Sequence, residues 1–177
     1  MSDGAARHIV LVGLMGSGKT TVGQLLARRL ERPFRDSDAD IEARTGRSVR
    51  ELKDELGEDA MHAIEAEELL GCLRGEEPDV IAAAASTIET DQCRRALVEP
   101  GVTVVWLRGS PALLASRFGS SAHRPSFGED PATFIAEQAR RRDPLFASLR
   151  PVAIDIADRS PDELVDSIVE RLVSGQG

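Results

Sequence analysis

The stretch HIVLVGLMGSGKTTVGQLL, residues 8–26, decides the fold of this chain. It begins with HIVLV (8–12), a short apolar run rich in β-branched residues, which predicts a fully buried strand. The glycine-rich segment GLMGSGKT (13–20) follows directly, and from Gly18 onward the apolar residues recur with helical spacing. A buried strand, a glycine-rich loop and a helix in immediate succession are typical of a phosphate-binding loop, or P-loop.

The glycine-rich segment matches the pattern G-x-x-x-x-G-K-[ST] in full. Glycines let the backbone curl so that several N–H groups point at one phosphate, and the helix that follows adds the positive end of its dipole. We expect Lys19 to place its charge on the β- and γ-phosphates and the Thr20 hydroxyl to bind Mg²⁺. The motif therefore predicts a nucleotide site that is formed by Gly13, Gly16, Ser17, Gly18, Lys19, Thr20 and Thr21.

Short apolar strands alternate with helices along the rest of the chain. We expect further strands at 32–38, 78–85, 102–107 and 151–156. Helices are expected at 18–30, 38–44, 58–73, 91–98 and 131–142, and from Ser48, Pro111 and Pro161. This alternation predicts an α/β fold, a three-layer sandwich with a five-stranded parallel sheet, in one domain over residues 1–177. The polar segment at about 119–130 is expected to be a loop that acts as a lid.

Composition narrows the range of partners. The chain has 177 residues and a formal net charge of −8, which opposes nonspecific binding to nucleic acids. No apolar run is long enough to span a membrane, and no signal-peptide core precedes the first strand. Cys72 and Cys93 lie far apart and form no metal-binding pair, so we expect reduced thiols. We therefore expect a cytoplasmic monomer without nucleic-acid or membrane partners.

The segment DSD (36–38) closes the second expected strand with two acids. Because parallel strands end at one edge of the sheet, these acids should lie near the P-loop. One carboxylate could hold a water of Mg²⁺, and the other could accept a hydrogen bond or a proton from a substrate hydroxyl. The alternative is a solvated turn or a helix N-cap, which we prefer for Ser37, whereas position favours a functional role for Asp36 and Asp38.

Together these motifs resemble the shikimate kinases, small P-loop kinases with the fold of the nucleoside monophosphate kinases. The resemblance covers nearly the whole chain and is most specific in VGLMGSGKTTVGQLLARRL (12–30) and DSDADIEARTGRSVREL (36–52). It implies ATP- and Mg²⁺-dependent phosphoryl transfer to a hydroxyl of a small molecule, converting shikimate to shikimate 3-phosphate.

The resemblance also implies roles on the donor side. Lys19 and Thr20 would bind phosphates and Mg²⁺, and Asp36 would hold a water of the metal ion. Arg117, in the segment SRF, would stack near the adenine. Arg124, in the segment HRP, would be the lid arginine that reaches the phosphates.

On the acceptor side, the resemblance implies that Asp38 binds the substrate hydroxyl and acts as its base. Arg142, in the segment RRDPLF, would pair with the substrate carboxylate, although its neighbour Arg141 could be confused with it.

The acceptor half departs from the family pattern in two places. The segment MHAIE (61–65) has His62 where the family has an arginine, and Glu65, one turn on, could pair with it. Ala84, Ala85 and Ser86 replace a glycine triplet that would expose bare backbone amides to the substrate. Imidazole cannot form the bidentate fork of a guanidinium and is mostly neutral at pH 7. A histidine packed on its helix face is the alternative for His62.

Three kinds of function therefore stay open. The first is a small-molecule kinase that uses shikimate or another hydroxylated acceptor, such as a sugar or a polyol acid. The second is a nucleoside monophosphate kinase, whose acceptor site would need more arginines than this half of the chain supplies. The third is a nucleotide-binding protein without turnover, which would have no need for Asp36, Asp38 and Arg124 in register with Lys19. These residues favour the first.

Overall fold

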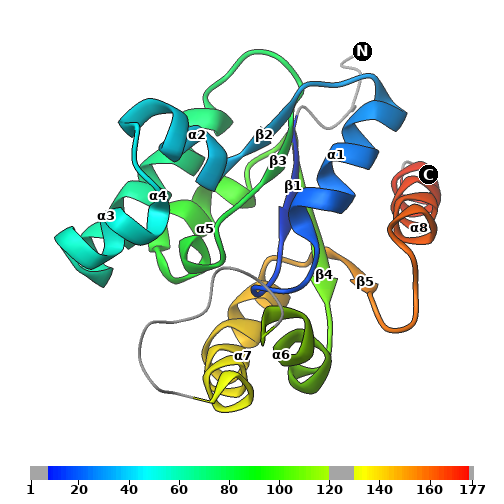
Figure 1. Ribbon diagram of the computed structural model, residues 1–177. Helices are drawn as coiled ribbons and strands as arrows, with labels where there is room; N and C mark the ends of the chain where they lie inside the picture. The colour runs from blue at the N-terminus through cyan, green and yellow to red at the C-terminus, as the bar shows by residue number, and fades with distance from the viewer. Residues whose placement is uncertain (1–7, 120–129, 176–177) are drawn as a thin grey trace.

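Five parallel strands form the central sheet of the computed structural model, which describes residues 8–119 and 130–175. The strand order is β2-β3-β1-β4-β5 (Figure 1). The strands are β1 His8–Val12, β2 Phe34–Asp36, β3 Val80–Ala82, β4 Val102–Arg108 and β5 Val152–Asp155. The predicted α/β fold with five parallel strands is confirmed. The expected lid segment 120–129, which includes Arg124, lies outside the described residues.

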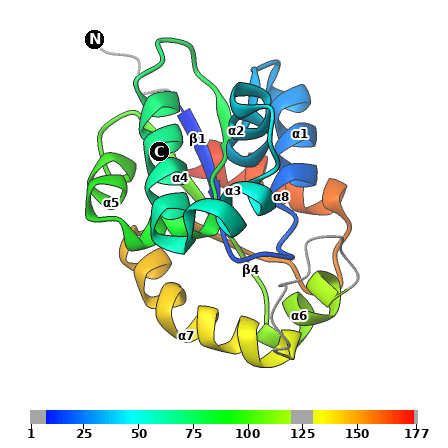
Figure 2. The same ribbon diagram turned by 60° about the vertical axis from the view of Figure 1, so that its left-hand side comes forward.

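Helices cover both faces of this sheet, so the predicted three layers are present. Helices α1 and α8 pack together on one face, and α4 and α5 lie on the other (Figures 1 and 2). Helices α6 and α7 contact each other beyond the end of β1 (Figure 2). The helices are α1 Lys19–Leu30, α2 Ser37–Thr45, α3 Val49–Leu56, α4 Glu58–Leu73, the 3₁₀ turn η1 Ala85–Glu89, α5 Asp91–Leu97, α6 Pro111–Gly119, α7 Pro131–Ser148 and α8 Pro161–Ser174.

Strand β1 lies at the centre of the sheet and is buried along its whole length. It pairs with β3 and β4, with Val10 opposite Ile81 on one side and Val104 on the other. Helix α1 approaches the sheet closely at Gly23, where a Cβ would lie 2.5 Å from the ring of Phe34. This close packing fixes the start of α1, and with it the P-loop, against the carboxyl end of β1.

Two of the expected element ends were wrong by three residues or more. Strand β3 ends at Ala82 rather than at residue 85, because the chain turns into η1, whose Thr87 hydroxyl donates to the Ala84 carbonyl at 2.7 Å. Helix α7 runs to Ser148 and passes through Pro144, whereas we expected it to end at Arg142. A proline inside a helix weakens it. Burial of Phe146, whose ring centroid lies 5.8 Å from that of Trp106, stabilises the last turns.

Helices α3 and α8 each begin after a capping serine. Ser48 forms a capping box with Glu51, and Ser160 forms one with Glu163. None of the helices in the described ranges combines the length and the apolar character needed to cross a membrane.

Candidate active site

The P-loop connects β1 to α1 and has a backbone that only glycine adopts easily. Gly16 has φ 82° and Gly18 has φ 88°. A Cβ on Gly16 would lie 2.7 Å from the carbonyl oxygen of Leu114 in α6. Gly18 is the N-cap of α1, so no capping side chain covers the first N–H groups of the helix, and its first turn carries no acidic residue. This cradle fits a phosphate group.

Lys19 lies at the mouth of this cradle and is held by neutral groups. Its Nζ donates to the carbonyl oxygens of Gly13 at 2.8 Å and Leu14 at 3.3 Å. Burial lowers the pKa of Lys19 to about 8, against the opposing effect of the Asp38 and Asp36 charges. The lysine is therefore mostly charged at neutral pH, and a phosphate could replace two neutral carbonyls as its partner.

Asp36 brings β2 to the P-loop, as predicted. The Thr20 hydroxyl donates to Asp36 Oδ2 at 2.6 Å. The other carboxylate oxygen accepts from the backbone N–H groups of Asp38 at 3.1 Å and Ala39 at 3.2 Å, so Asp36 is also the N-cap of α2. A hydroxyl and a carboxylate oxygen side by side form a donor set that Mg²⁺ prefers. We expected Ser37 to lie in a solvated turn or to cap the helix, and this was wrong: it is a buried residue inside the first turn.

Asp38 stands between the P-loop and α4. It is exposed in the first turn of α2, and its charge acts on both Lys19 and Glu65. The carboxylate is thus placed where a group bound between the donor side and the acceptor side could reach it.

His62 and Glu65 both lie on α4 but have separate partners, so the pair that the sequence allowed between them is not formed. His62 Nε2 lies 3.6 Å from Glu58 Oε1, one turn toward the N-terminus, which is the direction in which helical side chains point. Glu65 is buried and accepts a hydrogen bond from the Ser86 hydroxyl. Burial lowers the pKa of His62 and raises that of Glu65. At neutral pH, His62 therefore supplies little positive charge.

The alanines after β3 form a turn rather than the end of a strand. Ala84 and Ala85 are partly exposed, and η1 begins at Ala85. Ser86 is buried and binds Glu65, so this turn is joined to α4 by a hydrogen bond.

Arg142 is the buried arginine of the segment RRR (140–142). Its side chain is only 5% exposed, whereas that of Arg141 is 58% exposed. Arg142 Nε donates to Glu89 Oε1 at 2.9 Å, and Arg141 Nη2 donates to the same oxygen at 2.6 Å. Helix α7 continues past both arginines, so Arg142 lies among its buried residues rather than at its end.

Glu89 is the residue of this site that the sequence did not single out. It ends η1, one turn after Ser86, in the segment that follows β3. Because β3 is parallel to β1, this segment leaves the sheet at the same edge as the P-loop. Glu89 lies between the strand expected over 78–85 and the helix expected over 91–98, and an acid in such a connection could have suggested a site residue. The turn that contains Glu89 was not predicted, because the alanines before it were interpreted as part of the strand.

Arg117 borders the P-loop from α6. A Cβ on Gly16 would lie 3.5 Å from Arg117 Cβ, which places the two elements in direct contact. Arg124 lies outside the described residues, so its role as the lid arginine stays a prediction.

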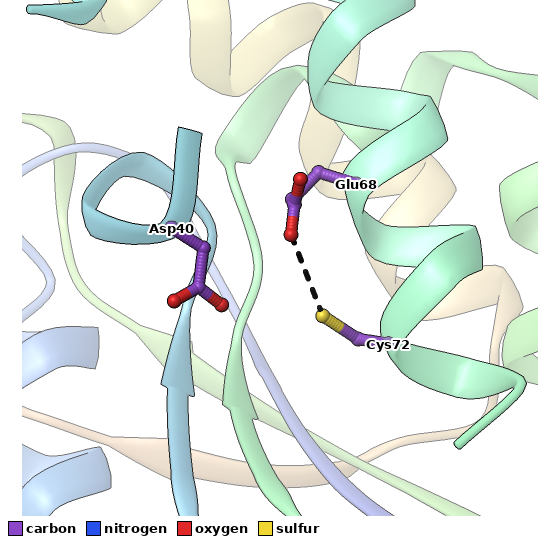
Figure 3. Close-up of side chains that lie close together, drawn as sticks. All are labelled: Asp40, Glu68 and Cys72. Atoms are coloured by element: carbon purple, nitrogen blue, oxygen red, sulfur yellow. Dashed lines mark hydrogen bonds between the residues drawn. The ribbon is translucent and has the colours of Figure 1, made fainter. Parts of the chain in front are cut away.

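A second cluster of ligand-type side chains lies on α2 and α4, where Asp40 faces Glu68 and Cys72 (Figure 3). Arg35 Nε donates to Asp40 at 2.7 Å, and Arg44 Nη2 donates to Glu68 at 2.8 Å. Burial raises the pKa of Cys72 to about 11, so its thiol stays protonated. The carboxylates already have cationic partners, and we interpret the cluster as an ion-pair network.

Comparisons with known proteins agree with this geometry. The sequence profile of the shikimate kinases matches residues 15–173. A shikimate kinase of Symbiobacterium thermophilum is 39% identical over 168 residues, which cover 93% of this chain and 95% of that protein. A shikimate kinase of Caulobacter vibrioides is 38% identical over 168 residues, which cover 94% and 82%. The solved shikimate kinase from Acinetobacter baumannii in complex with shikimate superposes with a TM-score of 0.90 at 29% identity, covering 98% of this chain and 96% of that one.

Proposed function

This chain belongs to the shikimate kinase family, and we propose from this that it transfers the γ-phosphoryl group of ATP to a hydroxyl of shikimate. The observation that carries the proposal is the meeting of Lys19, Thr20 and Asp36 at one edge of the sheet, with Asp38 beside them. A mere nucleotide-binding protein would have no need for a second acid in this position.

The donor half would hold Mg-ATP through the P-loop. The N–H groups at the start of α1 would surround a phosphate, and Lys19 would exchange its carbonyl partners for phosphate oxygens. Thr20 would contribute its hydroxyl to Mg²⁺, and Asp36 would hold a water of the ion. Bound in this way, Mg-ATP supplies the phosphoryl group and the metal ion that neutralises developing charge.

Asp38 would act on the acceptor hydroxyl. Its carboxylate would first orient the hydroxyl by accepting a hydrogen bond. It would then take the proton as the new oxygen–phosphorus bond forms and the bond to the ADP oxygen breaks. Position is the main requirement of this reaction, and Asp38 lies within the electrostatic reach of both Lys19 and Glu65.

The acceptor half would bind the substrate ring between α4, η1 and α7. Arg142 is the buried cation on this side, and its charge acts on Lys19, His62 and Glu65. It would pair with the substrate carboxylate. His62, Glu65, Ala84 and Ala85 would border the ring.

A different hydroxylated acceptor, such as a sugar or a polyol acid, is the second candidate. Two observations favour it: Arg142 already binds the carboxylate of Glu89, and His62 is mostly neutral. Both features reduce the positive charge that an anionic acceptor would meet.

We further propose that the enzyme acts as a cytoplasmic monomer with a lid at about 119–130. The buried free thiols of Cys72 and Cys93 support a reducing compartment, and the net charge of −8 supports small molecules rather than nucleic acids as ligands.

The test is release of ADP from Mg-ATP with and without shikimate. We expect shikimate-dependent release in the wild type and a loss of about 10²- to 10³-fold in Lys19→Ala, since one preorganised contact to developing charge contributes that much. Arg28→Ala, an exposed change on the same helix, is the matched control and should keep the wild-type rate. Tight binding of Mg-ATP without acceptor-dependent release of ADP would contradict the proposal.

A further inference from the structure

The buried arginine of the acceptor side, Arg142, already binds a carboxylate of the protein itself, that of Glu89. Glu89 Oε1 accepts hydrogen bonds from Arg142 Nε at 2.9 Å and from Arg141 Nη2 at 2.6 Å. Arg142 comes from α7 and Glu89 from η1, so the pair joins two elements at the end of the sheet. One carboxylate oxygen thus binds two guanidinium groups.

The Glu89–Arg142 pair lies within the site rather than on a remote surface. The Arg142 charge lowers the pKa of His62 on α4, together with the larger effect of burial, and it opposes the raised pKa of Glu65. It also acts on Lys19 at the start of α1. The guanidinium is therefore a common neighbour of the donor cation and of both acceptor residues on α4.

Glu89 is ionised at neutral pH. Burial alone would raise its pKa, but the hydrogen bonds and charges of Arg142 and Arg141 hold the pKa of Glu89 below its usual value. Glu89 therefore already supplies Arg142 with an anionic partner before any acceptor binds, although it shares its one charge between Arg142 and Arg141.

Among the described residues, the other cationic side chains around Arg142 have partners or positions of their own, and Arg141 binds the same Glu89 oxygen. His62 is mostly neutral, and Lys53 of α3 lies 3.7 Å from Glu58, which is its own anionic partner. Lys19 faces the P-loop, where the phosphates would bind. An acceptor carboxylate would have to displace Glu89 from Arg142, or share Arg142 with it, in a site that also holds Asp38. Like charges brought together in a partly buried site oppose binding.

Resting on the function proposed above, we propose that Glu89 determines acceptor specificity. Its carboxylate competes with the carboxylate of an acceptor for Arg142, so the site disfavours anionic acceptors relative to neutral polyhydroxylated ones. Shikimate would still be phosphorylated, but it would bind weakly.

Calorimetric titration of shikimate into the Mg-ADP complex tests this in the wild type and in Glu89→Gln. Glutamine keeps the length and a carbonyl oxygen for Arg142 but removes the charge. We expect shikimate to bind at least about tenfold more tightly to Glu89→Gln, the size of one charge-assisted contact. The analogue in which a hydroxymethyl group replaces the carboxylate should change by less than about threefold, because it makes no charged contact.

The controls separate a charge effect from a structural one. Glu137→Gln removes the same charge from an exposed position on α7 and should leave both affinities unchanged. Glu89→Thr removes the carboxylate with a different shape and should also tighten shikimate binding if the charge is what matters. Circular dichroism of each variant establishes that it is folded.

Several results would overturn the role of Glu89. Unchanged or weaker shikimate binding in Glu89→Gln would mean that Glu89 only positions Arg142. Equal tightening for the neutral analogue, or no shikimate binding in any variant, would also contradict it. These outcomes are independent of catalysis, so a protein without acceptor-dependent release of ADP would refute the kinase proposal while the binding experiment still tests Glu89.

Discussion

The two cations of the site, Lys19 and Arg142, differ in what holds them. Lys19 is bound by the neutral carbonyls of Gly13 and Leu14, whereas Arg142 is bound by the charged carboxylate of Glu89. A phosphate that approaches Lys19 displaces only neutral groups, but an acceptor carboxylate must compete with another carboxylate at Arg142. The comparison teaches that one α/β scaffold can hold a donor side ready for a charged ligand beside an acceptor side whose buried arginine already has an anionic partner.

The largest effect is expected where the two sides meet, at Asp38. Asp38→Asn keeps the shape but removes the base, and we expect turnover to fall by about 10²- to 10⁴-fold, the usual contribution of a general base. Measurement of the steady-state rate of ADP release checks this, with the affinity for Mg-ADP as the control that should not change. Loss of Mg-ADP binding in the variant would mean that Asp38 is needed on the donor side, and it would contradict the role of Asp38 as the base for the acceptor hydroxyl.

The scaffold shared by both sides depends on the close approach of α1 to the sheet. In Gly23→Ala the new Cβ would meet Phe34 at 2.5 Å and Leu11 at 2.9 Å, so we expect the free energy of unfolding to fall by about 1–3 kcal/mol. Urea denaturation measures this change.

Gly71→Ala is the matched control for the packing of α1. Gly71 is exposed on α4, and a Cβ there would meet nothing within 4 Å. This variant should be unchanged or up to about 1 kcal/mol more stable, because alanine favours a helix interior. Equal destabilisation of both variants would mean that close packing at Gly23 is not the cause.

On the donor side, the affinity for Mg-ADP should depend on pH. Lys19 is charged below its pKa of about 8 and neutral above it, and phosphate binding needs the charged form. We therefore expect the affinity for Mg-ADP to be flat well below pH 8 and to fall toward tenfold per pH unit above it, as for the loss of one proton. In Lys19→Ala the affinity should be weak and flat over the same range, and a parallel decline in both proteins would refute the assignment to Lys19.

The smallest effect is expected on the acceptor side, from His62→Arg. A guanidinium would add a permanent charge and a fork for a carboxylate, so we expect the KM for shikimate to fall by about 3- to 10-fold. His62→Gln, which stays neutral, should give no such gain. An identical KM in the two variants would mean that position 62 does not face the acceptor.

Local chemistry explains which features could be predicted from the sequence. The P-loop, the acids after β2 and the capping box of Ser48 with Glu51 depend on neighbouring residues, and each is present. The partners of His62 and Arg142 depend on contacts between distant segments, such as the one between α7 and η1.

The length of α7 also depends on a contact between distant segments of the chain. Pro144 predicts a helix end by its local chemistry, but burial of Phe146 against the sheet outweighs that tendency. Glu89 was overlooked for a related reason, because the alanines before it read as a strand and the turn at Ala85 is formed only in the folded chain.

The most direct test of the account is a phosphorus NMR spectrum of the wild-type protein with Mg-ATP and shikimate. The account predicts one new phosphomonoester signal that grows in step with ADP as the γ-phosphate signal of ATP declines. Only ADP with inorganic phosphate, or an unchanged ATP spectrum while Mg-ATP is bound, would contradict it.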